Sequence, residues 1–395
     1  MGLALAARTE AGARLVALAE VLAEDLAGRA AQHDRAGTFP FASVERLAAA
    51  GFYTAPVPAR HGGLGAESLH DVIVAASRLA RGDASVAIGV NMHYAALMNM
   101  VRQWRTAVTA GAGARAARLG AALERIVADG VRLAAAISER GQDLTRPGTT
   151  ATRTATGWRV DGRKLFCTGS PAATVLYTSV CFAGDDGAER YGYAMVPAGA
   201  EGVTVHGDWD ALGMRASGSH SVTFDRVALA SEAVTGGFRA GDAEGYMARN
   251  LNAGLFHAAA SLGIAETAQA HARTAAARTG EARARGLVAE GEIDLAAARG
   301  TLARAAELID DQRPGDDVAA LFAEAQAAKA FVNEAACRVV DRALGLSGGA
   351  GYLNGHPLAR AARDVRAGAF MHPLGSNRAY DLVGRVALRA AVAIH

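Results

Sequence analysis

The stretch Asp161-Gly162-Arg163-Lys164-Leu165-Phe166-Cys167-Thr168-Gly169-Ser170 lies near the middle of the 395-residue chain. Leu165 in this stretch belongs to a series of short apolar or alternating runs that Gly, Pro and Asp residues separate. Runs of this kind, bounded by turn residues, are typical of β-strands. The series begins near Leu133 and ends near residue 232, so the sequence predicts a β domain over residues 133–232.

Helical patterns flank this β region on both sides. Leu15, Leu18 and Leu22 recur at the spacing of one helix face, and alanine-rich helical stretches return from about Glu244. We therefore expect an N-terminal helical domain over residues 1–132 and a C-terminal helical bundle over residues 233–395. This is an α+β fold. Its order of helices, strands and helices excludes a doubly wound nucleotide-binding domain, in which strands and helices alternate.

The composition of the chain limits the kinds of partner that we expect it to bind. The formal net charge of +2 comes from 41 basic and 39 acidic residues spread along the chain, which predicts no binding to nucleic acid or to an anionic membrane. No segment reaches the roughly 20 apolar residues of a membrane span, and the N-terminus lacks an apolar stretch of signal length. Cys167, Cys181 and Cys337 have apolar neighbours and form no CxxC pair, so we expect reduced thiols, no metal site and a cytoplasmic protein.

Several segments together resemble the acyl-CoA dehydrogenase superfamily over nearly the whole chain. They are Pro58–Gly65, Ile137–Glu139, Asp161–Ser170, Leu212–Arg215, Gly348–Tyr352 and Arg363-Asp364. Each segment alone is a weak motif, but chance matches would not stay in order and spacing over so much of the chain. The resemblance implies an acyl-CoA dehydrogenase-like fold of helical, β and helical domains that together hold a flavin.

The resemblance also implies which residues face the flavin. In that family, the strand segments that correspond to Ile137, Ser138, Phe166 and Thr168 lie against the flavin ring, and Ser170 ends the second of these segments. A flavin needs an apolar wall and a few hydrogen-bond donors, and Phe166 with Thr168 supplies one of each from one strand. The alternative interpretation is that Phe166 is ordinary sheet core and Thr168 an ordinary strand residue.

The catalytic base of the family is missing. Family dehydrogenases abstract an α-proton from an acyl thioester with a glutamate at a fixed distance after the Arg-Asp pair. Counted without gaps from Arg363-Asp364, that position is His372, and a second family location for the glutamate corresponds to Ala253. Either His372 has taken over proton abstraction or the chemistry differs, because losing a positioned base typically costs about two to four decades of rate.

One branch of the superfamily lacks this glutamate: the two-component flavin monooxygenases, which receive reduced flavin from a reductase and form a C4a-hydroperoxide with O2. The segment Trp209–Ser219 resembles that branch. We therefore expect a monooxygenase that oxidises carbon, nitrogen or sulfur of a small-molecule or carrier-bound metabolite, with His372 and His93 lining the pocket. A packing role stays open for both histidines. The alternatives are an acyl-CoA or acyl-carrier dehydrogenase or desaturase with an unusual base, and a non-catalytic flavin-fold scaffold.

The cofactor expected from the resemblance is FAD or FMN. Family members that hold FAD tightly grip its ADP half across a subunit contact, using an arginine followed by Phe-Gly and a glutamine before a Gly-Gly turn. Arg278 matches the arginine and Gly348-Gly349 match the turn, but Thr279 and Gly345 depart from the pattern. A homotetramer or dimer follows from the resemblance alone, with the Arg278 region as the expected contact.

Overall fold

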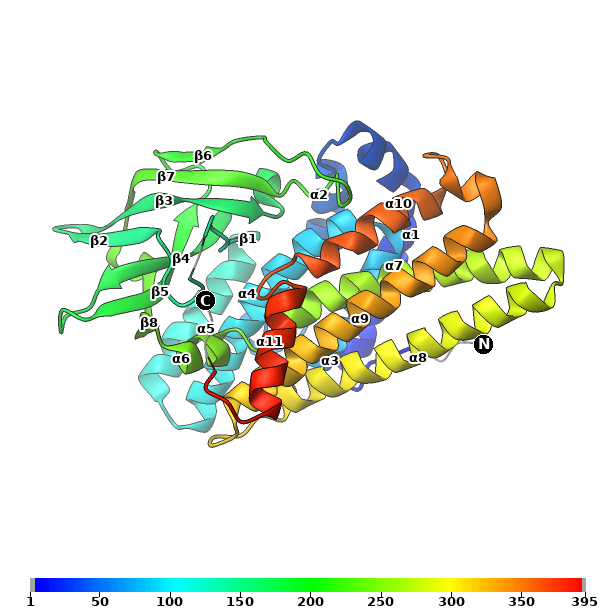
Figure 1. Cartoon of the computed structure of the whole chain (residues 1–395). Coiled ribbons are helices and arrows are strands. Elements are labelled where there is room, and N and C mark those ends of the chain that lie inside the picture. Colours follow the sequence, from blue (N-terminus) through cyan, green and yellow to red (C-terminus); the bar gives the residue numbers. More distant parts are fainter. Residues whose placement is uncertain (1–3, 142, 393–395) are drawn as a thin grey trace.

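The computed structural model describes residues 4–141 and 143–392 of the chain. Its helices and strands occur in three successive groups along the sequence, and Figure 1 shows the sheet at one side of a long helical bundle. The first helices are α1 (Glu10–Ala36), α2 (Phe41–Ala49), α3 (Leu69–Gly82), α4 (Ala84–Thr109) and α5 (Gly113–Ala128). The last are α6 (Ala243–Arg249), α7 (Ala253–Thr279), α8 (Ala282–Asp310), α9 (Val318–Leu346), α10 (Pro357–Asp364) and α11 (Ser376–Ala387).

The middle group is a mixed sheet. Its strands are β1 (Leu133–Ala136), β2 (Thr150–Thr154), β3 (Gly157–Cys167), β4 (Val175–Ala183), β5 (Glu189–Pro197), β6 (Val203–Val205), β7 (His220–Leu229) and β8 (Val234–Arg239). They pair in the order β6-β7-β3-β2-β4-β5-β8, and β1 adds to β4 in parallel. The sheet therefore extends beyond residue 232, where we expected the β domain to end, because β8 pairs with β5.

Side-chain caps fix the residues at which the helices near the site begin. The Ser68 hydroxyl accepts a hydrogen bond from the Asp71 amide at 3.3 Å and begins α3. Asp83 ends α3 and begins α4, since its carboxylate accepts from the Ser85 amide at 2.8 Å. This shared residue leaves almost no loop between the two helices, so α4 starts at a defined angle and runs beneath β1.

α7 is the central helix of the bundle. It contacts α3, α4, α8 and α9, and it is apolar on nearly every face, with Leu255, Phe256 and Leu262 fully buried. Among the described residues, no helix is both long enough and apolar enough to cross a membrane. The N-terminal half of α7 lies between α4 and the loop after α10, where a mostly apolar cavity is found.

Candidate functional site

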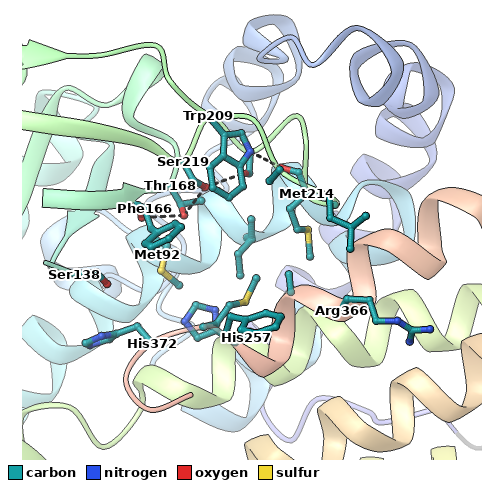
Figure 2. A pocket seen from close by; sticks show the side chains of 18 of the residues that line it. Met92, Ser138, Phe166, Thr168, Trp209, Met214, Ser219, His257, Arg366 and His372 are labelled. Carbon is teal, nitrogen blue, oxygen red and sulfur yellow. Dashed lines mark hydrogen bonds between the residues drawn. The ribbon is translucent and has the colours of Figure 1, made fainter. Parts of the chain in front are cut away.

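A cavity of about 400 Å³ lies between the sheet, α4, α7 and the segment after α10. Figure 2 shows side chains of the β domain on one side of it, with His257 and His372 facing them. Its lining residues are Ile88, Met92, Ala135, Ile137, Ser138, Phe166, Thr168, Trp209, Ala211, Leu212, Gly213, Met214, Ser217, Ser219, His257, Arg363, Arg366, Ala367, Phe370, Met371 and His372. None of these described lining residues carries a carboxylate.

Phe166 presents its ring to this cavity instead of to the sheet core. The β3–β7 pairing shifts register between Lys164 and Cys167, and Phe166 has a φ of 55°, which is rare outside glycine. The bulge leaves the ring 61% exposed, with its edge contact to Trp209 at a centroid distance of 6.1 Å. An aromatic surface exposed inside a cavity is a wall that a flat apolar ring can cover.

A chain of hydroxyl groups runs beside Phe166. Thr168 Oγ1 lies 2.9 Å from Ser219 Oγ, and Ser219 Oγ lies 2.7 Å from Ser217 Oγ (Figure 2). All three side chains are buried and line the cavity. Because hydroxyl groups rotate to suit a partner, this chain can donate to a polar edge placed against it.

A buried ion pair supports the segment after β1, which carries Ile137 and Ser138. Lys164 Nζ, fully buried, donates to the Glu139 carboxylate at 2.6 Å and to Ser179 Oγ at 2.9 Å. The Leu165 amide donates to the Ser138 carbonyl at 2.8 Å and joins the two segments. The pKa of Glu139 is lowered despite its burial because the Lys164 ammonium and several hydrogen bonds stabilise the carboxylate. The two flavin-facing segments predicted from the resemblance are thus held side by side.

His372 enters the cavity from the loop after α10. Its Nε2 lies 3.3 Å from the Tyr246 hydroxyl, and burial together with the nearby Lys329 and Lys164 charges lowers its pKa to about 3. The imidazole is therefore neutral at pH 7 and a weak base. Lys329 on α9 holds the loop, because its ammonium donates to the carbonyls of Met371, His372 and Leu374.

His257 on α7 is a cavity residue that the sequence interpretation missed. Its side chain is buried beside His372, and its Nδ1 has no hydrogen-bond partner among the described residues. Burial, with the charges of Lys329 and His372, lowers its pKa well below the ordinary value. The sequence did contain a signal for His257. It stands four residues after Ala253, the second family location of the base, and residues four apart share a helix face.

His93 does not lie in the cavity, contrary to our expectation. It is fully buried, with Nε2 2.8 Å from the Tyr53 carbonyl and Nδ1 accepting from the Leu133 amide at 3.0 Å. Both ring nitrogens are therefore used by the backbone, and burial lowers the pKa of His93 to about 4. The helix turns this side chain away from Met92, which does line the cavity. His93 ties the start of β1 to α4, which is a structural role.

The remaining predicted cofactor residues lie outside the cavity lining. Ser170 is buried, and its hydroxyl donates to the Gly218 carbonyl at 3.1 Å. Arg278 is exposed at the end of α7, and Gly348 and Gly349 are exposed after α9, on the side of the bundle away from the sheet (Figure 1). A single chain does not bring these residues to the cavity. Their role in holding the cofactor stays a prediction.

The residues present fit a flavin ring. The exposed Phe166 ring and the Ile137 side chain form an apolar wall, while Thr168, Ser217 and Ser219 offer hydroxyl groups along it. A mostly apolar cavity with a few convergent polar groups is the usual setting for a flavin. No group of three or more potential metal ligands occurs within residues 4–141 and 143–392.

Comparisons with known proteins agree with this geometry. Residues 13–108, 134–227 and 245–377 match the N-terminal, middle and C-terminal domains of acyl-CoA dehydrogenase. The chain is 35% identical to the L-evernosamine nitrososynthase of a Micromonospora species over 391 residues, covering 96% of this chain and 91% of the relative. It is 34% identical to the amino sugar nitrososynthase DnmZ of Streptomyces peucetius, covering 96% and 94%.

A solved structure extends the similarity to the whole fold. KijD3, crystallised with FMN and dTDP-3-amino-2,3,6-trideoxy-4-keto-3-methyl-D-glucose, superposes with a TM-score of 0.90 at 32% identity. The match covers 99% of this chain and 97% of KijD3. These similarities confirm the predicted fold and flavin cofactor, and they favour a monooxygenase over an acyl-CoA dehydrogenase. The chain therefore belongs to the acyl-CoA dehydrogenase superfamily, in which it is a flavin-dependent oxidoreductase.

Proposed function

We propose that the protein is a flavin-dependent monooxygenase that oxidises the amino nitrogen of a sugar carried on a nucleoside diphosphate. The proposal is supported by the 35% and 34% identity to amino sugar nitrososynthases over nearly the full chain. Bound reduced flavin, as FMN or exchangeable FAD, supplies the electrons that activate O2. A separate reductase would provide that reduced flavin, and a homo-oligomer would complete the cofactor site near Arg278.

The observation that carries the proposal is the absence of a carboxylate among the described residues that line the cavity. Abstraction of an α-proton from an acyl thioester needs a positioned base, and the family position for it is His372. Burial and two lysine charges lower the pKa of His372 to about 3, so this imidazole is too weak a base to replace a glutamate. Dehydrogenation therefore lacks its proton acceptor.

The same electrostatics suit oxidation of an amine. Oxygen transfer to nitrogen requires a free lone pair, so the bound amine must be neutral. Lys329 lies behind the His372 loop, and no acidic side chain among the described lining residues is available to stabilise an ammonium ion. Like charge nearby and burial both lower the pKa of a bound amine, which favours its neutral form.

The side chains of the cavity exclude water and orient the substrate for this chemistry. The apolar wall of Ile88, Met92 and Phe166 excludes water from the reacting atoms. The neutral His372 ring lines the cavity, and its Nε2 lies 3.3 Å from the fully buried Tyr246 hydroxyl, which helps to fix the orientation of the ring. The His372 ring can orient a sugar hydroxyl or carbonyl without protonating the amine.

Isotope labelling tests the proposal. The protein is mixed with FMN, a flavin reductase, NADH, 18O2 and a dTDP-linked amino sugar, and the product is analysed by mass spectrometry. We expect 18O on the former amine nitrogen, and no product when O2 is omitted. Anaerobic bleaching of bound oxidised flavin by an acyl thioester, without oxygen incorporation into any amine, would overturn the proposal in favour of the dehydrogenase alternative.

A further inference from the structure

A second cavity, of about 500 Å³, opens toward the C-terminal end of α4. It lies between α4, the residues before α3 and the loop that joins α8 to α9. Its lining residues are Glu67, Leu69, Met98, Val101, Arg102, Arg105, Thr106, Thr109, Ala110, Asn252, Ile309, Asp310, Gln312, Arg313 and Pro314. We call this space the arginine cavity, after Arg102, Arg105 and Arg313.

The three arginines have no carboxylate partner. Most arginines of the described chain form ion pairs, but none of these three does so within residues 4–141 and 143–392. Arg102 bonds only neutral acceptors: Asn99 Oδ1 at 2.9 Å, the Ala248 carbonyl at 2.7 Å and Gln312 Oε1 at 3.3 Å. Burial and the neighbouring Arg249 charge lower the pKa of Arg102 to about 10. A largely buried cation without a counter-ion is costly, and an anion would relieve that cost.

The two acidic residues that line the arginine cavity do not supply the missing charge. Asp310 accepts from Ser68 Oγ and from the amides of Leu69 and His70, so its carboxylate is committed to the start of α3. Among the described residues, Arg105 bonds the backbone carbonyl of Glu67, at 3.5 Å, and forms no ion pair with its carboxylate. An anionic ligand therefore remains the complement that the arginines lack.

A small space of about 50 Å³ lies between the arginine cavity and the flavin cavity. It shares His257 and His372 with the flavin cavity, and it shares Asn252 with the arginine cavity. Asn252 and His257 are both 4% exposed, and Asn252 Oδ1 and His257 Nδ1 have no hydrogen-bond partner among the described residues. Two buried polar atoms without partners in the same junction indicate a polar ligand that passes through it.

The α4 helix spans all three spaces. Met92 lines the flavin cavity and the junction, and Arg102 lines the arginine cavity. At the rise of an α-helix, their separation of ten residues corresponds to about 15 Å. A ligand that reaches both ends must therefore be extended, with one end at the flavin and an anionic portion farther along α4.

We propose that these three spaces bind one sugar nucleotide, with the sugar in the flavin cavity beside His257 and His372 and the phosphates in the arginine cavity. The narrow junction at Asn252 holds the glycosyl–phosphate link. Arg102 and Arg313 bind the diphosphate, since the planar guanidinium matches phosphate oxygens with paired donors. This inference rests on the proposed function and adds to it the location of the nucleotide and the residues that select a diphosphate carrier.

The test measures binding of dTDP to the full-length protein by isothermal titration calorimetry, with thymidine as the probe that lacks phosphate. We expect dTDP to bind at least tenfold more tightly than thymidine. Arg102→Met and Arg313→Met should each weaken dTDP binding five- to twentyfold. Arg14→Met removes an exposed arginine of α1 that lines neither cavity, and it should leave the affinity within twofold.

The Arg313→Met variant keeps the test decisive even if Arg102→Met fails to fold. Arg313 is exposed, and within the described residues its guanidinium makes no hydrogen bond or ion pair, so its replacement does not disturb the fold. Unchanged dTDP affinity in this variant, or dTDP binding that FMN displaces, would overturn the inference.

The binding test is independent of catalysis. Arginine-dependent dTDP binding without oxidation of any amino sugar would preserve this site and refute the proposed function. Amine oxidation without arginine-dependent dTDP binding would refute this site and preserve the proposed function.

Discussion

Lys329 Nζ lies 3.3 Å from the carbonyl oxygen of His372, and it is bonded to the carbonyls on both sides of that residue as well. A buried ammonium on α9 thus fixes the backbone that carries His372 into the cavity. Three carbonyl acceptors use all three donors of the ammonium. Burial nevertheless lowers the pKa of Lys329 to about 7, so the loop is held by a group that titrates near neutrality.

Replacement of Lys329 by Met should lower kcat by about ten- to a hundredfold, because the His372 loop loses its anchor and small displacements are costly in a catalytic site. FMN affinity should change by less than threefold, since Lys329 does not line the flavin wall. Steady-state kinetics and flavin fluorescence titration measure the two effects. An unchanged kcat would show that the loop keeps its place without Lys329.

Lys329→Met should also change how the unfolding free energy depends on pH. The folded pKa of Lys329, about 7, lies below its ordinary value of 10.5, so between these values the unfolded chain binds a proton that the folded chain does not. The unfolding free energy of the wild type, relative to Lys329→Met, should therefore rise from pH 7 to pH 9.5. Urea denaturation at several pH values measures this difference, and a flat difference would contradict the shifted pKa.

His372 should make the unfolding free energy decrease as the pH becomes acidic. Its folded pKa of about 3 lies below the ordinary 6.5, so its contribution to stability is complete above pH 6.5 and is lost as the pH falls toward 3. In His372→Gln, the unfolding free energy should fall less steeply between pH 6.5 and 4.5, by up to about 1.4 kcal/mol per pH unit. Equal acid-side slopes in the two proteins would mean that His372 is protonated in the folded state.

The hydroxyl chain should contribute to flavin binding. Thr168→Val keeps the shape of the side chain but removes the hydroxyl that lies 2.9 Å from Ser219 Oγ. We expect the Kd for FMN to rise roughly five- to thirtyfold, which corresponds to about 1–2 kcal/mol for one lost hydrogen-bonding group. Ser170→Ala is the matched control, because that hydroxyl is also buried but lies outside the cavity lining. A larger effect at Ser170 than at Thr168 would reverse our assignment.

The ion pair below the flavin wall should be a stability determinant. Glu139→Gln leaves the Lys164 ammonium buried without its charge partner at 2.6 Å, and we expect a loss of about 3 kcal/mol or more in unfolding free energy. Asp381→Asn removes an exposed partner of Arg385 on α11 and should cost no more than about 0.5 kcal/mol. Comparable costs for the two variants, measured by urea denaturation, would refute the role of the buried pair.

Much of the architecture was predictable because it depends on local patterns. The period of Leu15, Leu18 and Leu22, and the alternation around Leu165, report helix and strand directly. The resemblance predicted which segments would face a flavin, and four of the predicted residues, Ile137, Ser138, Phe166 and Thr168, line one cavity. The end of the sheet was not predictable, because β8 is defined by its pairing with β5 and not by its own sequence.

The histidines show where such prediction stops. We expected both His372, at the family position of the glutamate, and His93 to line the pocket. Met92 on α4 does line it, but His93 faces away and is bonded to the backbone through both ring nitrogens. His257 stands four residues after Ala253, but its place in the cavity is decided only when α7 packs beside the His372 loop. Side-chain direction and hydrogen-bond partners depend on contacts between distant segments.

Residue type and spacing by themselves predicted the order of helical, β and helical regions. The resemblance of the sequence to the acyl-CoA dehydrogenase superfamily predicted the strand segments that would face a flavin and the replacement of the family's glutamate by His372. Only the tertiary structure decided the protonation and surroundings of the site. Burial and the charges of Lys329 and Lys164, which come from two separate elements, lower the pKa of His372 through space, and His257 from a third element is buried beside it. The glutamate position thus becomes a neutral, weakly basic imidazole through desolvation, which no local pattern encodes.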